Sequence, residues 1–401
     1  MSELFYIAIA MIAGLLLTRV VKLVQLPNVT GYLIAGLLIG PYCFRFITPE
    51  ALSALDIITV AALGFIAFSI GSEFKLAHIK AIGGKILVIT ACEALGAVIL
   101  VDVVVSLLGF PVPMALCLGA IAAATAPAAT LLVVRQYHAK GELTSTLLPV
   151  VAMDDAVGLM AYALSVSVAK MIQNGDAFSV MNTIVDPLLE IILSLAVGAV
   201  IGTLVAISNR FFHSKANRLC ISIAAVMLGV AIAQKFNLSH LLLCMAIGAT
   251  YVNLREDAIQ TLEQADSWTP PLFMLFFVIS GADLNVAMLP SLGLIGVVYI
   301  LTRVLGKYFG AFIGCTISKT SHKIRKYLGF SLIPQAGVAI GIAQLVVKEL
   351  PEYGASIQAV ILCATLIYEL IGPVVTKFSL IKAGEIEVEK KQKPAQPTAA
   401  Q

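Results

Sequence analysis

The feature that most limits the fold of this sequence is a series of long apolar runs that follow one another along nearly the whole chain. An α-helix needs about 20 predominantly apolar residues to cross the hydrocarbon core of a bilayer. The runs predict about thirteen membrane-spanning helices, at residues 4–24, 30–47, 53–72, 84–108, 112–134, 144–170, 186–211, 218–235, 239–254, 268–285, 289–317, 325–347 and 355–381. Charged residues make up only 12% of the 401 residues, against about 25% in a soluble domain. We therefore expect an all-α polytopic membrane protein.

The distribution of Lys and Arg predicts how these spans are oriented. If the N-terminus lies outside, twenty of the 26 basic residues fall in cytoplasmic segments. Four fall outside, namely Arg45, Lys170, Lys235 and Lys348. This asymmetry follows the positive-inside rule. The first run has no basic segment before it, so it is predicted to be an uncleaved span rather than a signal peptide. We expect a bacterial inner-membrane protein with a cytoplasmic C-terminus and, at a net charge of +3, no nucleic-acid partner.

Two adjacent carboxylates, Asp154 and Asp155, lie inside the apolar run at 144–168. A carboxylate at membrane depth costs several kcal/mol unless it is paired, hydrated or protonated, so it marks an ion or proton pathway more often than a structural pair. Desolvation favours its protonated form, and a proton and a cation compete for the same oxygens. Hard oxygen ligands suit sodium or lithium rather than a soft metal. Asp154 and Asp155 are therefore predicted to be the proton-binding and metal-ion-binding residues.

Two basic residues, Arg303 and Lys307, lie within the run at 289–317 on one helix face. Since adjacent helical residues point about 100° apart, one aspartate can face a cation while the other faces Arg303. Arginine does not deprotonate in proteins, so we expect Arg303 to be a fixed counter-ion. Lys307 is either a second counter-ion or a side chain that snorkels to the interface. Glu93, in the fourth run, either tunes this site or is a structural partner for a Thr or Lys.

Two runs contain residues that interrupt a helix. The fifth run contains Thr125 and Pro127, and the twelfth contains Pro334, Gln335 and Gly337. Proline removes a backbone donor and clashes with the preceding turn. Non-helical backbone at membrane depth is tolerated only where it lines a cavity or is buried in protein. Either segment alone is compatible with a simple proline kink.

The places of these two segments in the chain predict internal symmetry. They correspond in two six-helix halves, about 4–170 and 218–381, on either side of a linker helix at 186–211. Paired interruptions of this kind predict inverted repeats with a transport site between them. The seven cysteines and five histidines do not cluster, so no cofactor is expected. A transmembrane domain at 1–381 is followed by a tail at 382–401 that is charged, then rich in Pro and Ala, and predicted to be disordered and cytoplasmic.

Taken together, these motifs resemble the cation:proton antiporter superfamily, which includes bacterial sodium/proton exchangers with a double-aspartate motif and related potassium-efflux transporters. The similar segments are 31–41, 68–74, 125–128, 153–156, 302–307 and 368–373. The resemblance implies a homodimer in the lipid bilayer, with a dimer domain and a mobile core domain that holds crossed broken helices. It implies a transporter that exchanges a monovalent cation for protons by alternating access and serves pH homeostasis. The cation that we expect is sodium.

The resemblance also assigns roles to individual residues. It implies that Asp155 binds the cation and the proton in turn, that Asp154 pairs with Arg303, and that Thr125 and nearby carbonyls supply further ligands. The double aspartate resembles the electrogenic branch rather than the Asn-Asp branch that exchanges one for one. The chain departs from the pattern at Arg303, where well-known electrogenic members carry a lysine.

Other functions remain open from the sequence. A potassium/proton exchanger and a sodium-coupled solute symporter on the same fold are both compatible with these motifs. An intramembrane aspartyl protease needs two carboxylates that face each other from different helices. Asp154 and Asp155 are adjacent on one helix, and Asp283 lies at the end of a segment. An enzyme is therefore not expected.

Overall fold

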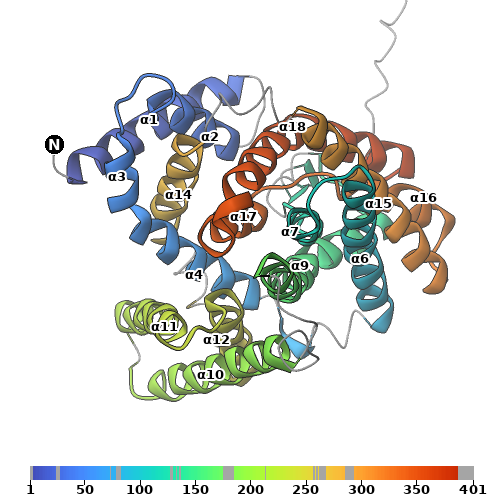
Figure 1. The fold of residues 1–401 in the computed structure, drawn as a ribbon. Helices are drawn as coiled ribbons and strands as arrows, with labels where there is room; N and C mark the ends of the chain where they lie inside the picture. Colours follow the sequence, from blue (N-terminus) through green and yellow to red (C-terminus); the bar gives the residue numbers. More distant parts are fainter. Residues whose placement is uncertain are drawn as a thin grey trace, which may run out of the picture.

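In the computed structural model of this protein, helices are the only regular secondary structure over the residues that it describes. These residues are 3–23, 28–72, 74–77, 83–126, 130–131, 133–134, 137–174, 185–212, 214–255, 258, 261, 268–284 and 293–386. They contain the fifteen helices labelled in Figure 1, and no strand occurs among them. Seven of these helices are long and apolar enough to cross a membrane.

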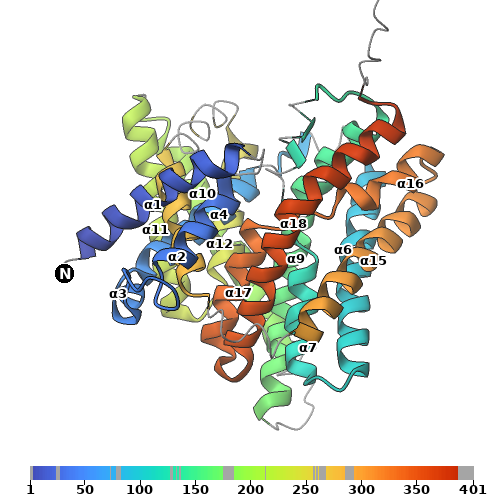
Figure 2. The same ribbon diagram turned by 90° about the horizontal axis from the view of Figure 1, so that it is seen from above.

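The helices pack into two bundles, which Figure 2 shows side by side. The first bundle contains eight helices: α1 (Glu3–Leu23), α2 (Asn28–Ile39), α3 (Pro49–Ala54), α4 (Asp56–Ser72), α10 (Asp186–Ser208), α11 (Lys215–Phe236), α12 (His240–Leu254) and α14 (Pro270–Ala282). The second bundle contains seven: α6 (Gly84–Leu107), α7 (Val112–Ala122), α9 (Glu142–Asn174), α15 (Gly293–Ile317), α16 (His322–Ser331), α17 (Gly337–Glu349) and α18 (Pro351–Ala383). Each bundle draws helices from both halves of the chain.

Each of the thirteen predicted spans contains at least one observed helix, but three boundaries were wrong. The span at 30–47 is helical only to Ile39, because Gly40 and Pro41 end α2. The span at 112–134 loses its helix after Ala122, and the span at 325–347 is divided into α16 and α17. The number of membrane crossings stays a prediction. Pro127 and residues 387–401 of the predicted tail lie outside the described residues.

In the second bundle α6 and α15 pack closely along much of their length, and glycines make this approach possible. A Cβ on Gly306 would lie 2.7 Å from both Ala97 Cα and Gly96 O, and one on Gly310 would lie 2.4 Å from Cys92 O. Small residues allow two helix backbones to approach in this way. We call Gly96, Gly306 and Gly310 the glycine seam. It brings the middle of α6 against the part of α15 that carries the two basic residues.

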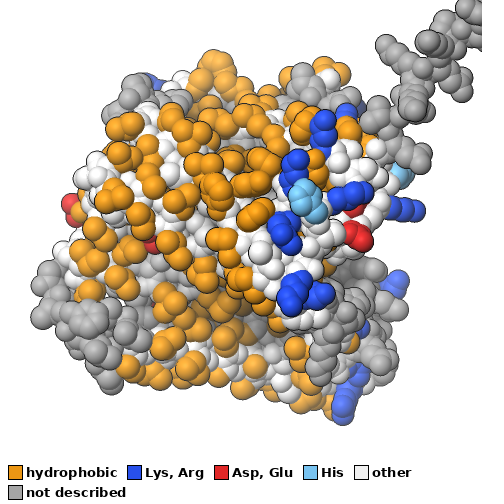
Figure 3. All heavy atoms as spheres, turned by 90° about the vertical axis from the view of Figure 1, so that its right-hand side faces the viewer, with side chains coloured by type: hydrophobic (Ala, Val, Ile, Leu, Met, Phe, Trp, Pro, Cys, Tyr) orange, Lys and Arg blue, Asp and Glu red, His pale blue; other side chains and the backbone are white. Residues whose placement is uncertain are grey.

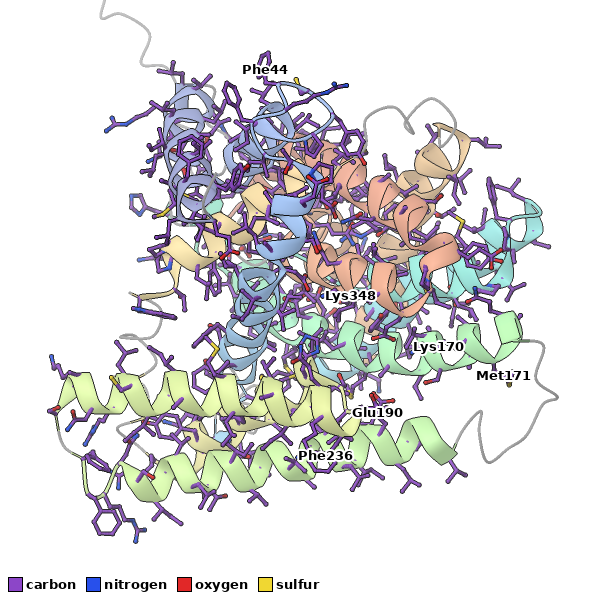
Figure 4. All side chains as sticks on the ribbon, turned by 60° about the vertical axis from the view of Figure 1, so that its left-hand side comes forward. Phe44, Lys170, Met171, Glu190, Phe236 and Lys348 are labelled. Atoms are coloured by element: carbon purple, nitrogen blue, oxygen red, sulfur yellow. The ribbon has the colours of Figure 1, made fainter. Side chains whose placement is uncertain are left out.

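The surface also agrees with a chain that crosses a bilayer. Figure 3 shows apolar side chains over most of one face, with Lys and Arg side chains gathered toward one side of it. Lys170 and Lys348, two of the residues predicted to lie outside, occur at the same end of the second bundle (Figure 4). There Lys170 Nζ lies 3.1 Å from Glu349 Oε2, which joins α9 to α17.

Candidate ion-binding site

The site is built where two broken segments cross inside the second bundle. After α7 ends at Ala122, residues 123–126 leave the helix, and residues 332–336 are non-helical between α16 and α17. The Ala126 N–H donates to Pro334 O at 2.9 Å, and Gln335 Nε2 donates to Ile121 O at 2.8 Å. The backbone groups freed by each break are thus partly satisfied by the other break. Gly337 begins α17 directly after the crossing.

Arg303 holds the carbonyl groups at this crossing. Its Nε donates to Ala122 O at 3.1 Å, and its two terminal nitrogens donate to Ile333 O at 2.7 Å and Ala124 O at 2.8 Å. Its guanidinium carbon also lies 4.6 Å from the centroid of the Tyr368 ring. Carbonyls at helix ends lack partners within the helix and carry partial negative charge. Arg303 therefore acts as a cationic clamp on both breaks.

Lys307, one turn further along α15, faces the carboxylates. Its Nζ lies 3.0 Å from Asp154 Oδ2, 2.7 Å from Glu93 Oε2 and 2.9 Å from Thr125 Oγ1. It also donates to Ala123 O. Lys307 and Glu93 are fully buried, so the snorkelling alternative for Lys307 is wrong.

The predicted pairing of Asp154 with Arg303 was therefore also wrong. The partner of Asp154 is Lys307, because the three guanidinium nitrogens of Arg303 donate to carbonyl groups of the two broken segments. A lysine thus lies beside the double aspartate, one helical turn after Arg303, the position at which the resemblance implied a lysine.

Asp155 lies beside this network with an oxygen still available. It is 2% exposed and accepts a hydrogen bond from the backbone N–H of Thr125. Among the described residues, neither Asp154 Oδ1 nor Asp155 Oδ1 has a hydrogen-bond partner. Buried carboxylate oxygens are costly to leave without one. A cation or a proton between α9 and the broken segment of Thr125 would satisfy them.

Position along α9 determines which way the two aspartates point. They lie within the 33-residue helix Glu142–Asn174, five and six residues after its internal Pro149. Gly158, one turn later, faces the broken segment, and a Cβ there would lie 3.5 Å from Ala123 Cβ, an ordinary contact distance. Since successive helical residues point about 100° apart, Asp154 reaches Lys307 while Asp155 faces Thr125.

The structure brings most of the predicted site residues together and adds Glu93. The crossing contains seven of them, namely Asp154, Asp155, Thr125, Arg303, Lys307, Pro334 and Gln335. The sequence left two roles open for Glu93. Gly96, three residues after it, packs against α15 in the glycine seam, and this contact brings Glu93 to the site. The described residues contain no cluster of three His, Cys, Asp or Glu side chains for a resident metal.

Comparison with known proteins places this geometry in context. The family model described as "Sodium/hydrogen exchanger, transmembrane" matches residues 7–382. The Na(+)/H(+) antiporter 1 of Methanocaldococcus jannaschii is 24% identical over 396 residues, covering 89% of this chain and 87% of the relative.

Solved structures agree with this match in fold. The sodium proton antiporter MjNhaP1 from the same organism, solved at pH 8, has a TM-score of 0.71 at 20% identity, covering 95% of this chain and 96% of that one. An electron-microscopy structure of the same antiporter has a TM-score of 0.74 at 18% identity, covering 96% and 99%. The two-bundle arrangement is therefore shared with a solved antiporter.

Proposed function

The chain belongs to the sodium/hydrogen exchanger family. We propose that it exchanges a monovalent cation for protons by alternating access, and that this cation is sodium. The observation that carries this proposal is the pair of buried oxygens, Asp154 Oδ1 and Asp155 Oδ1, that lack partners at the crossing of two broken segments. The transported cation is the substrate, and the proposal includes no cofactor and no enzymatic step.

Asp155 is the group that binds the cation and the proton in turn. Its carboxylate is buried, so its charge must be balanced either by a bound proton or by a bound cation. Both ligands need the same oxygen, and occupancy by one displaces the other. Thr125 and Asp154 supply further oxygens beside it, and all of these are hard ligands that suit sodium or lithium. Competition at one carboxylate is sufficient to couple the two fluxes.

Access to this site alternates by movement of the second bundle against the first. Every charged group of the site belongs to the second bundle, and the helices of each bundle contact one another far more extensively than they contact the other bundle. The two bundles are built from inverted repeats at about 4–170 and 218–381, with the linker helix at 186–211 between them, and two chains form a homodimer. The proposal also includes a bacterial inner membrane and a cytoplasmic C-terminus, and the uneven distribution of Lys and Arg supports this orientation.

Two alternatives on the same fold are less well supported. The curated relative and the solved structures are antiporters for sodium and protons, which favours exchange over solute symport. A potassium/proton exchanger would use the same groups with longer distances between cation and ligand.

The test is proton movement in proteoliposomes on separate addition of sodium, lithium or potassium. We expect a sodium- or lithium-driven pH change that disappears in Asp155→Asn, because an amide neither binds a proton nor balances a cation. Glu142→Gln is the matched control, since Glu142 lies exposed in the first turn of the same helix. Absence of cation-driven proton movement in folded wild-type protein would reject the proposal, and a response to potassium alone would change the substrate.

A further inference from the structure

Glu369 is a buried carboxylate that the proposed exchange does not use. It lies in the middle of α18 and is 1% exposed. It faces Thr30 in the first turn of α2, so it lies where the second bundle meets the first. Its Oε2 has no hydrogen-bond partner among the described residues. An oxygen of this kind is costly inside a membrane protein unless a ligand satisfies it.

Two threonine hydroxyls beside Glu369 also lack partners. Thr30 and Thr365 are buried, and within the part of the chain that the structure describes neither Oγ1 has a hydrogen-bond partner. Thr365 lies one turn before Glu369 on the same face of α18. Other threonines in these helices, such as Thr90 and Thr302, donate to the carbonyl one turn earlier. Three buried side-chain oxygens at this point of the interface therefore have lone pairs available.

A backbone oxygen adds to this set. Pro373 follows Glu369 by one turn inside α18, and proline has no N–H to donate to the carbonyl four residues before it. That carbonyl belongs to Glu369 itself. Backbone carbonyls that lose their helical donors coordinate sodium in transporters with interrupted helices. Glu369 therefore offers an oxygen from its side chain and another from its backbone.

No basic side chain balances the charge of Glu369. Over the residues that the structure describes, no Lys, Arg or His forms an ion pair with it. Arg303 lies 4.6 Å from the ring of the adjacent Tyr368, but its three guanidinium nitrogens donate to carbonyls of the broken segments. A buried carboxylate must be balanced by a cation or a proton. A protonated carboxyl donates only one hydrogen bond, whereas a hard cation contacts several oxygens at once.

The packing of α18 and α2 places these oxygens beside the crossing of the broken segments. A Cβ on Gly372, in the turn after the carboxylate, would lie 2.8 Å from Pro334 Cγ. From the other side, Val29 of α2 packs against Ala126 and Ala336. The oxygens therefore lie next to the crossing, where the first bundle covers it.

We propose that Glu369, Thr365 and Thr30 form a second monovalent-cation site, separate from the transport site at Asp155 and built between the two bundles. Carboxylate, hydroxyl and carbonyl oxygens are hard ligands that suit sodium. A monovalent ion balances the single negative charge, whereas a divalent ion would leave a buried positive charge. Because the ligands come from both bundles, the bound ion stabilises this conformation over one in which the bundles have moved. That effect on the cycle rests on the proposed function, but the binding does not.

The test counts the sodium ions that bind to the full-length chain in detergent, by calorimetric titration in a choline buffer at mildly alkaline pH. We expect two ions per chain in wild type, one in Asp155→Asn, one in Glu369→Gln and none in the double variant. In the Asp155→Asn background, Thr30→Val or Thr365→Val should weaken the remaining ion by about tenfold or more, as the loss of one coordinating or supporting group does at other metal sites. Glu352→Gln is the matched control with two ions, since Glu352 lies exposed in the first turn of the same helix.

Thermal midpoints give a second measure, because a ligand that binds the folded state raises the midpoint. Sodium should raise the midpoint of Asp155→Asn and leave that of Asp155→Asn with Glu369→Gln unchanged. A midpoint of Asp155→Asn that responds through Glu369 to pH but not to sodium would show that Glu369 holds a proton, and would overturn the proposal. Absence of sodium binding to Asp155→Asn, or remaining binding that Glu369→Gln does not remove, would overturn it as well.

The outcomes separate this inference from the proposed function. A wild-type chain that binds two sodium ions but moves no protons in vesicles rejects the exchange and leaves the second site in place. A wild-type chain that exchanges sodium for protons but binds only one ion rejects the second site alone. If Glu369→Gln does not fold, Asp155→Asn and its combination with Thr30→Val still decide.

Discussion

Lys348 of α17 and Asp56 of α4 form an ion pair between the two bundles, with Nζ and Oδ2 2.6 Å apart. At the same end, Gln358 Nε2 donates to Asp283 Oδ2 at 2.8 Å, and Gln344 Nε2 donates to Ser280 Oγ at 3.1 Å. These contacts join α17 and α18 to α4 and α14. Lys348 and Asp56 belong to the end that is predicted to lie outside.

Breaking this ion pair should change the rate of exchange more than the stability of the fold. The two side chains are 48% and 42% exposed, and exposed pairs contribute about 0–1 kcal/mol. Lys348→Gln or Asp56→Asn should therefore change the exchange rate by at most about fivefold at low salt, with a smaller effect at high salt.

The control for this prediction is Lys170→Gln. It breaks the similarly exposed pair with Glu349, which joins two helices of the same bundle. The exchange rate should stay at the wild-type value in this control, and the charge swap of Asp56 and Lys348 should restore it. Equal effects from both pairs would show that the contact does not report on movement between the bundles.

The glycine seam should be intolerant of even one methyl group. Gly306→Ala places a Cβ 2.7 Å from the backbone of α6, so the helices must separate, at a cost of about 1–3 kcal/mol. We expect a lower thermal midpoint in detergent and slower exchange, since Lys307 moves away from Glu93. Gly296→Ala is the matched control on α15, because a Cβ there meets nothing within 4 Å and alanine favours the helix by about 1 kcal/mol.

Arg303→Lys should weaken the crossing without changing the coupling ratio. A lysine cannot reach three carbonyls in the fixed geometry of a guanidinium, and it loses the planar contact with Tyr368. Thermal stability and exchange rate should both fall, while the number of protons per cation stays the same. Loss of proton coupling in folded Arg303→Lys would instead mean that Arg303 takes part in proton transfer.

The N-terminus of α9 should depend on a residue that follows α18. The Glu385 carboxylate accepts hydrogen bonds from Leu143 N at 2.6 Å, Thr144 N at 2.8 Å and Thr144 Oγ1 at 2.7 Å. Such a cap contributes about 1–2 kcal/mol. Glu385→Ala should lower the thermal midpoint more than Glu385→Gln, which keeps one acceptor. Glu142→Gln, in the same turn but outside the cap, should leave the midpoint unchanged.

Much of the site could be predicted because each of its residues is, by itself, unusual within a membrane-spanning helix. An aspartate pair, an arginine and two prolines each stand out within an apolar run, since each is costly there without a partner. Glu93 was equally visible, but its role was open because a lone glutamate in a helix does not say which neighbour it meets.

The sequence by itself determined the all-helical membrane fold, the two broken segments and the identity of the charged groups. These follow from run length, proline and desolvation, which act locally along the chain. Only the tertiary structure decided that Lys307 rather than Arg303 meets Asp154 and Glu93. Arg303 and Lys307 lie one turn apart on the same face of α15. Their partners depend on where the glycine seam sets α15 against α6 and on where the broken segments leave carbonyl groups without partners.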